Sequence, residues 1–167
     1  MQHSEWIEKH HEKICPNGLV LDLACGAGRN SVFLLGKGFR VLAVDIDVLK
    51  LQEFQRHKNL LLIQADLEGG LWPFAEKVFD AIVVTNYLWR PLFPKIAFSL
   101  KTEGVVLYET FASGNEKYGR PKNPDFLLQP GELPKQFDGF SVLDYYHGEV
   151  KTPKPAVKQA IAAKRVV

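Results

Sequence analysis

Long apolar runs, cysteines and an excess of either charge are all scarce in this 167-residue chain. No apolar run approaches the roughly 20 residues that span a bilayer, so we expect neither a transmembrane helix nor a signal peptide, and no membrane partner. Cys15 and Cys25 form neither a metal-ligand spacing nor a disulfide framework, and His10 and His11 have no third ligand nearby. We therefore expect no metal site and a cytoplasmic location.

Neither sign of charge dominates the composition. Lys and Arg number 21 against 19 Asp and Glu, and a net charge of +2 does not indicate a surface that coats nucleic acid, although it leaves such a partner open. Hydrophobic residues make up 46% of the chain, which suits an ordinary globular protein with one core. We expect residues 1–167 to form a single domain, with a leading helix within residues 1–16.

What the sequence does contain is an apolar run at residues 20–24 that breaks into a Gly-Xaa-Gly turn and then into a helix-like run. Gly26 and Gly28 let the backbone approach a ligand where a Cβ would collide. The following helix start aims free N–H groups and a positive dipole end at an anionic or carboxylate-bearing ligand. In nicotinamide and flavin enzymes the turn continues as Gly-Xaa-Gly-Xaa-Xaa-Gly, and its last position is Gly or Ala. Here that position is Ser31, which weakens the alternative of a dinucleotide-binding enzyme.

Strand-like and helix-like segments alternate along most of the chain. This order predicts a parallel sheet with right-handed crossovers. The predicted strands are 19–23, 40–44, 60–63, 79–84, 105–109, 141–147 and 156–166, and the predicted helices are 4–14 with Ser4 as its N-cap, 30–35, 48–56 with Asp47 as its N-cap, 91–100 and 131–137.

The stretch from Asp22 through Gly26-Ala27-Gly28 to Ser31 resembles motif I of the class I S-adenosylmethionine-dependent methyltransferases. Its Gly-Ala-Gly-Arg-Asn-Ser run is especially similar to the tellurite-resistance type branch of that superfamily. The resemblance implies a Rossmann-like, doubly wound α/β fold whose seven-stranded sheet is mostly parallel with an antiparallel last strand. It also implies S-adenosylmethionine as cofactor, S-adenosylhomocysteine as product, and methyl transfer by in-line displacement.

The same resemblance implies where the cofactor would bind. Asp45, at the carboxyl end of the second strand, can accept hydrogen bonds from both ribose hydroxyls. Asp66 and the N–H of Leu67 fit the adenine contacts, although Asp66 could instead cap the local backbone. Main-chain carbonyls near Ala24 and Thr85 fit the ammonium of the methionine end. The full cofactor-binding prediction comprises Ala24, Gly26, Gly28, Arg29, Asn30, Asp45, Ile46, Asp66, Leu67, Thr85 and Asn86.

Residues after the fourth strand correspond by position to motif IV. Methyltransferases that act on nucleobase amines often carry Asn or Asp, two prolines and an aromatic residue there, whereas this chain has Asn86-Tyr87 without the prolines. The missing prolines make a nucleobase amine a less favoured acceptor without excluding it. Two residues are candidates for the chemistry: Tyr87 could cover the sulfonium or only pack, and Glu109 could bind substrate or remove a proton, or only cap a loop.

Residues 111–130 are rich in Gly, Pro, Asn and charge, and a segment this long and irregular is often a functional lid. Its Lys117, Arg120 and Lys122 could attract an anionic substrate or simply keep a loop solvated. We expect a methyltransferase with a small-molecule acceptor. The alternatives are a nucleotide or RNA methyltransferase and a cofactor-binding accessory subunit without turnover of its own.

Overall fold

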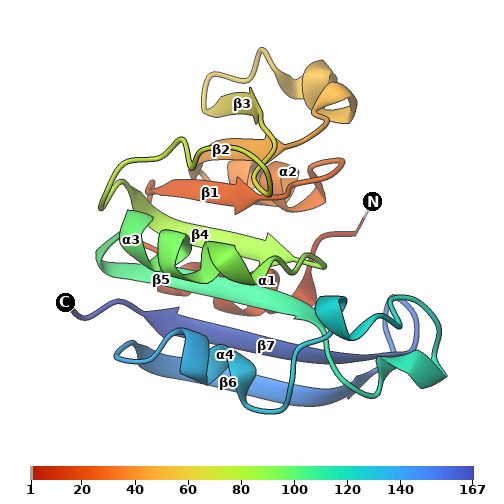
Figure 1. The fold of residues 1–167 in the computed structure, drawn as a ribbon. Helices are drawn as coiled ribbons and strands as arrows, with labels where there is room; N and C mark the ends of the chain where they lie inside the picture. The colour runs from red at the N-terminus through yellow and green to blue at the C-terminus, as the bar shows by residue number, and fades with distance from the viewer. Residues whose placement is uncertain (1) are drawn as a thin grey trace.

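The computed structural model describes residues 2–167 and contains one sheet of seven strands (Figure 1). The strand order is β3-β2-β1-β4-β5-β7-β6; the neighbours from β3 to β5 are parallel, and β7 is antiparallel to both β5 and β6. This confirms the doubly wound α/β fold and its antiparallel last strand. The strands are β1 Leu19–Leu23, β2 Arg40–Asp45, β3 Leu60–Gln64, β4 Phe79–Thr85, β5 Leu100–Phe111, β6 Ser141–Val150 and β7 Ala156–Lys164.

Helices cover both faces of this sheet, with α3 and α4 on the near face and α1 and α2 on the far face in Figure 1. Ser4 is the N-cap of α1 as predicted, because its Oγ accepts a hydrogen bond from the N–H of Ile7 at 3.3 Å. No helix in the described part of the chain is long and apolar enough to cross a bilayer. The α-helices are α1 Glu5–His10, α2 Arg29–Gly36, α3 Phe93–Ser99 and α4 Glu132–Gln136, and the 3-10 helices are η1 His11–Lys13, η2 Leu49–Phe54, η3 Arg90–Leu92, η4 Asn115–Lys117 and η5 Pro124–Phe126.

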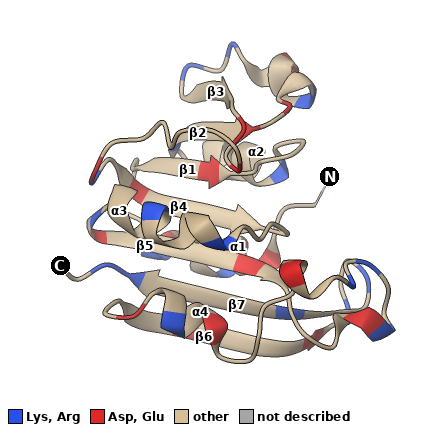
Figure 2. Cartoon of the chain, in the orientation of Figure 1, with Lys and Arg blue, Asp and Glu red and all other residues tan. Residues whose placement is uncertain are grey.

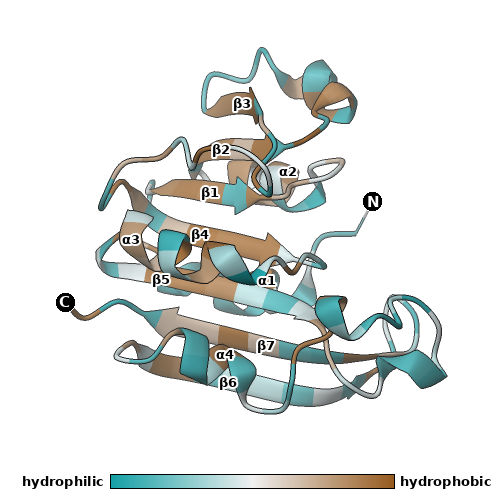
Figure 3. Ribbon diagram, viewed as in Figure 1, coloured by the Kyte–Doolittle hydropathy of each residue, from teal (hydrophilic) through white to brown (hydrophobic). Residues whose placement is uncertain are grey.

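Two apolar cores form because successive side chains of a strand point to opposite faces. On β4, Ala81 and Val83 join the core under α1 and α2, whereas Ile82 and Val84 join the core under α3. Figure 3 shows β1, β4 and β5 as mostly hydrophobic and β6, at the edge, as much less so. The central strands are therefore held from both sides, and their carboxyl ends keep a fixed arrangement.

The prediction of an α-helix over residues 48–56 is wrong, because the chain forms the six-residue 3-10 helix η2 there instead. Asp47 Oδ1 accepts a hydrogen bond from the N–H of Leu49 at 2.9 Å, which is a local turn, and the N-cap position is occupied by Val48. Leu51 is fully buried and Val48 is 8% exposed, whereas Leu49 is 64% exposed. Val48 and Leu51 are three residues apart, a spacing that a 3-10 helix places on one side.

The helix predicted from Pro91 to residue 100 also begins differently. Pro91 lies in η3, and the α-helix α3 starts only at Phe93, with Pro94 in its first turn. A proline lacks an N–H and is tolerated only in the first turn of a helix, so the second proline delays the regular helix by one turn.

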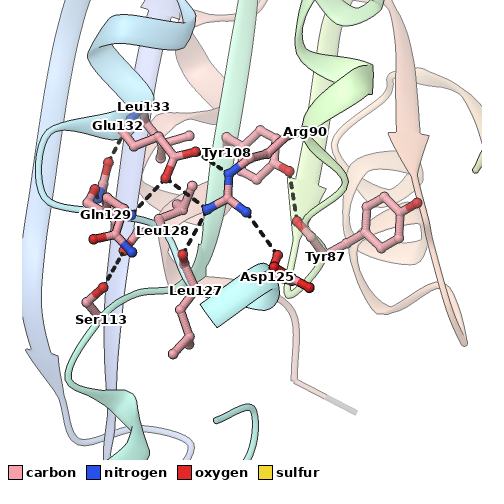
Figure 4. Close-up of polar contacts among 11 residues, drawn as sticks. Tyr87, Arg90, Tyr108, Ser113, Asp125, Leu127, Leu128, Gln129, Glu132 and Leu133 are labelled. Atoms are coloured by element: carbon pink, nitrogen blue, oxygen red, sulfur yellow. Dashed lines mark hydrogen bonds and ion pairs between the residues drawn. The ribbon is translucent and has the colours of Figure 1, made fainter. Parts of the chain in front are cut away.

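Arg90 anchors the end of residues 111–130 (Figure 4). Its guanidinium donates to both carboxylate oxygens of Glu132, at 2.6 and 3.1 Å, and to the backbone carbonyls of Asp125 at 3.0 Å and Leu127 at 2.9 Å. One planar side chain thus ties η3 to η5 and to the start of α4. Whether the rest of this segment closes over a ligand stays a prediction.

Replacing Arg90 with methionine should lower the free energy of unfolding by about 2 kcal/mol, because Glu132 and two carbonyls lose their partner. We expect less than the full effect of breaking a buried pair because the Arg90 side chain is 35% exposed. Urea denaturation measures the change. Lys117→Met is the control, since both partners of its ion pair with Glu149 are exposed and the midpoint should barely change. Equal midpoints for Arg90→Met and the wild type would contradict a stabilising role for the Arg90 contacts.

Candidate functional site

The first pocket lies at the carboxyl ends of β1 to β4, where the strand order reverses between β1 and its neighbours β2 and β4. Open α/β sheets bind ligands at this place. Figure 2 shows acidic segments in red at the ends of β1 and β2. The pocket has a volume of about 350 Å³ and is lined by Ala24, Asp45, Ile46, Ala65, Asp66, Leu67, Glu68 and Tyr87.

The glycine turn beside this pocket has two glycines with different roles. Both adopt positive φ, 55° at Gly26 and 80° at Gly28. A Cβ at Gly26 would meet no atom within 4 Å, and the Gly26 N–H donates to Asp45 Oδ2 at 2.8 Å. A Cβ at Gly28 would lie 2.0 Å from Leu51 Cδ2, inside the core. Gly26 therefore leaves open space for a ligand, whereas Gly28 lets the turn close on η2.

Behind the turn, Asp22 is 2% exposed and accepts a hydrogen bond from Ser31 Oγ at 2.6 Å. Burial raises the pKa of the Asp22 carboxyl to about 6, although the Ser31 bond works in the opposite direction. Sequence reasoning used Ser31 as a departure from the dinucleotide fingerprint and as part of the motif I resemblance, and assigned it no contact. The structure shows that Ser31 fastens the start of α2 to β1.

Asp45 and Asp66 both reach the first pocket while also holding their own loops. Asp45 Oδ1 accepts from the N–H of Asp47 at 3.1 Å. Asp66 Oδ1 accepts from the N–H groups of Glu68 at 3.0 Å and Gly69 at 3.1 Å, so the local cap considered for Asp66 is present. Each carboxylate oxygen has two lone pairs, so these bonds do not exhaust either side chain.

Tyr87 covers the first pocket as a neutral phenol. Its hydroxyl donates to Glu68 Oε1 at 3.0 Å. Its backbone carbonyl accepts from the hydroxyl of Tyr108 at 2.8 Å (Figure 4). Burial, reinforced by the Glu68 carboxylate, moves the pKa of Tyr87 above its usual range. The phenol thus keeps its proton at neutral pH, so Tyr87 fits a covering role better than that of a base.

A second pocket is lined by Asn86, which directly precedes Tyr87 of the first pocket in sequence, so both pockets border the loop after β4. It contains Glu109, whose Oε1 accepts from Ser4 Oγ at 2.9 Å. The second pocket has a volume of about 310 Å³ and is lined by Gln2, His3, Ser4, Glu5, Arg29, Asn86, Glu109, Val150, Thr152, Pro153 and Lys158.

Arg29 and Asn30 lie between the two pockets and the N-terminal segment. Asn30 is 3% exposed, accepts from the Ser4 N–H at 2.9 Å and donates to Thr85 Oγ1 at 2.9 Å. Arg29 donates to the Gln2 carbonyl at 3.1 Å and to Thr85 Oγ1 at 3.3 Å. The prediction that Arg29 and Asn30 bind the cofactor stays a prediction, and their side chains contact the protein groups named above.

Sequence reasoning missed Ser4 and Lys158 as members of a site. Lys158 is 7% exposed and comes from β7, far from the glycine turn in sequence. One signal was available: Lys158 and Gln159 interrupt a strand whose other residues through position 163 are apolar and buried. A lysine is almost never fully buried without a functional or structural partner.

The sequence pattern of the family described as "Methyltransferase domain" matches residues 20–104. The chain belongs to this family. The match spans every lining residue of the first pocket and confirms the class I S-adenosylmethionine-dependent methyltransferases as the family indicated by the glycine turn. The second pocket of this methyltransferase-family chain also uses residues outside the matched range, among them Ser4 and Lys158.

Relatives and solved structures agree with this assignment. YqeM of Bacillus subtilis (strain 168), named provisionally as a methyltransferase, is 31% identical over 125 residues, which cover 67% of this chain and 49% of YqeM. The chain thus spans about half the length of that curated relative. A SAM-dependent methyltransferase of Methanosarcina mazei has a TM-score of 0.78 at 15% identity, with 100% of both chains covered.

Two further structures share the fold. TehB from Haemophilus influenzae has a TM-score of 0.78 at 20% identity, with 98% of this chain and 62% of TehB covered. The 1,6-didemethyltoxoflavin-N1-methyltransferase of Burkholderia thailandensis, solved with bound 1,6-didemethyltoxoflavin and S-adenosylhomocysteine, has a TM-score of 0.74 at 17% identity, with 96% of this chain and 75% of that chain covered. At these identities the likeness establishes the architecture and leaves the acceptor open.

Proposed function

We propose that this protein transfers a methyl group from S-adenosylmethionine to a small-molecule acceptor, with the cofactor in the first pocket and the acceptor in the second. The observation that carries the proposal is that both pockets border the same loop after β4, the first through Tyr87 and the second through Asn86. A direct displacement needs donor and acceptor side by side, aligned and shielded from water. The bound 1,6-didemethyltoxoflavin and S-adenosylhomocysteine of the Burkholderia thailandensis enzyme supply a precedent on the same fold.

The residues of the first pocket fit this cofactor. The open space at Gly26 would be filled by a Cβ, so the turn can take the methionine end at close range. The carbonyls of Ala24 and Thr85 would accept from its ammonium, and the Asp45 carboxylate would hold the ribose. Asp66 and the Leu67 N–H would hold the adenine. These assignments keep the predicted role of each residue.

The bound cofactor would supply an electrophilic methyl carbon on a sulfonium. The residues of this chain would bind and orient the cofactor and the acceptor and exclude water from them. These effects can account for most of the rate acceleration without a dedicated acid. Glu109 lies in the second pocket and could take a proton from a protonated acceptor. Tyr87 would cover the reacting groups from the side of the first pocket.

Asp45→Ala should weaken binding of S-adenosylhomocysteine by roughly ten- to a hundredfold, because hydrogen bonds to a charged group contribute about 1.5 to 3 kcal/mol. Calorimetric titration measures the change, with the oxidised nicotinamide dinucleotide as a ligand that should not bind. Asp47→Ala is the matched control, since Asp47 is exposed on the same loop and only caps Leu49. An unchanged affinity in a folded Asp45→Ala protein would refute the ribose role.

Two further measurements on the purified protein, of RNA binding and of methyl transfer, distinguish this proposal from its two alternatives. A nucleotide or RNA methyltransferase would bind RNA with an affinity that falls steeply with salt. An accessory subunit would bind the cofactor but transfer no methyl group to any acceptor until a partner chain is added.

A further inference from the structure

Lys158 places a buried ammonium in the wall of the second pocket. Its Nζ donates to Asn86 Oδ1 at 2.9 Å, lies 3.9 Å from Glu109 Oε1 and lies 5.1 Å from the ring centre of Phe111. An ammonium has three N–H donors, and among the described residues only Asn86 accepts one within hydrogen-bonding distance. Burial lowers the pKa of Lys158, while the Glu109 carboxylate opposes that change. Lys158 therefore has donors left for a ligand in this pocket.

The four charged side chains that line the second pocket balance one another. Two cations, Arg29 and Lys158, face two carboxylates, Glu5 and Glu109. Both carboxylates already accept hydrogen bonds within the protein, Glu5 from Thr152 and Glu109 from Ser4. A sulfonium bound next to Asn86 would add one positive charge in a partly water-excluded site, where charges interact strongly.

We propose that the methyl acceptor is a small monoanion whose charged oxygen group, such as a carboxylate, binds to the ammonium of Lys158 in the second pocket. This inference rests on the proposed function for the assignment of that pocket to the acceptor. An anion would use the remaining ammonium donors, whether the first pocket holds the sulfonium or the neutral thioether of S-adenosylhomocysteine. The volume of about 310 Å³ is at the lower end for ligand pockets and suits a compact acid.

The test is a calorimetric titration with benzoate and acetate and with their neutral amides, benzamide and acetamide, each with and without saturating S-adenosylhomocysteine. We expect at least one acid to bind the wild-type protein with S-adenosylhomocysteine about tenfold or more tightly than its amide, because a charge-assisted hydrogen bond is lost in the amide. Lys158→Met should reduce this preference to within about twofold. Lys154→Met, which removes an exposed lysine from the same hairpin, should leave it unchanged.

Lys158→Gln is a second variant that keeps a donor for Asn86 without the charge, and it replaces Lys158→Met if that protein fails to fold. Equal affinity for acid and amide, no binding of either acid, or a preference that survives in the folded variant would each overturn the monoanion inference. If S-adenosylhomocysteine binds in those cases, the proposed function stands by itself. If S-adenosylhomocysteine does not bind but a Lys158-dependent preference for acids is measured, the anion site stands and the proposed function falls.

Discussion

Gly28→Ala should lower the free energy of unfolding by about 3 kcal/mol, which is a large part of the stability of a domain this size. A Cβ at this position would lie 2.0 Å from Cδ2 and 2.7 Å from Cγ of Leu51, which is fully buried. The backbone also has a φ of 80°, which an L-residue adopts at a penalty of about 1 to 2 kcal/mol. Overpacking and backbone strain therefore act together, and urea denaturation measures their sum.

Gly26→Ala is the matched variant in the same turn. Its φ of 55° brings a similar backbone penalty, but a Cβ there meets no atom within 4 Å. We expect a loss of only about 1 kcal/mol in stability, because overpacking is absent. The methyl group would instead occupy the space assigned to the cofactor and weaken S-adenosylhomocysteine binding by at least about tenfold. Equal stability losses in the two variants would contradict the separate roles of the two glycines.

Asp22→Asn should stabilise the protein by about 3 kcal/mol at alkaline pH. The pKa of Asp22 is raised from an ordinary 3.8 to about 6 in the folded protein, so folding favours the protonated carboxyl. The contribution of this group to stability is fully present below pH 3.8 and is lost as the pH rises through about 6. Asparagine is neutral throughout and its Oδ1 can still accept the Ser31 hydroxyl, so it avoids that loss.

Urea denaturation at about pH 8 and about pH 4 checks this prediction, because the gain should be nearly absent at the lower value. Asp47→Asn, on the exposed loop after β2, is the control and should show no such pH-dependent gain. A gain of the same size at both pH values would show that packing, and not ionisation, distinguishes Asp22 from asparagine. A buried carboxylate that reduces stability beside a ligand turn is the arrangement expected where function and stability compete.

The sequence predicts the first pocket better than the second because the first is built from residues at strand ends. β1 was predicted with its observed bounds, since a continuous apolar run ends there in a glycine turn. Asp45 and Asp66 follow apolar runs in the same way, and the carboxyl ends of parallel strands meet at one edge. Local pattern and a general rule of sheet topology are sufficient for this part of the site.

The second pocket could be predicted only in part in this way, because Asn86 and Glu109 stand at strand ends whereas Ser4 and Lys158 do not. Ser4, Asn86, Glu109 and Lys158 come from the start of α1, the loop after β4, and the strands β5 and β7. They meet because β7 is inserted antiparallel between β5 and β6, in a register that pairs Glu109 with Ala160. A one-residue slip in that register would turn Lys158 to the other face of the sheet.

The sequence by itself determined the alternation of strands and helices, the glycine turn and the family to which the chain belongs, because each depends on periodicity or turn chemistry within a short window. Only the tertiary structure decided that Ser31 pairs with Asp22, that residues 49–54 form a 3-10 helix over Gly28, and that Lys158 faces Asn86. These contacts join residues far apart in sequence. They depend on strand order, register and burial, which no local pattern specifies.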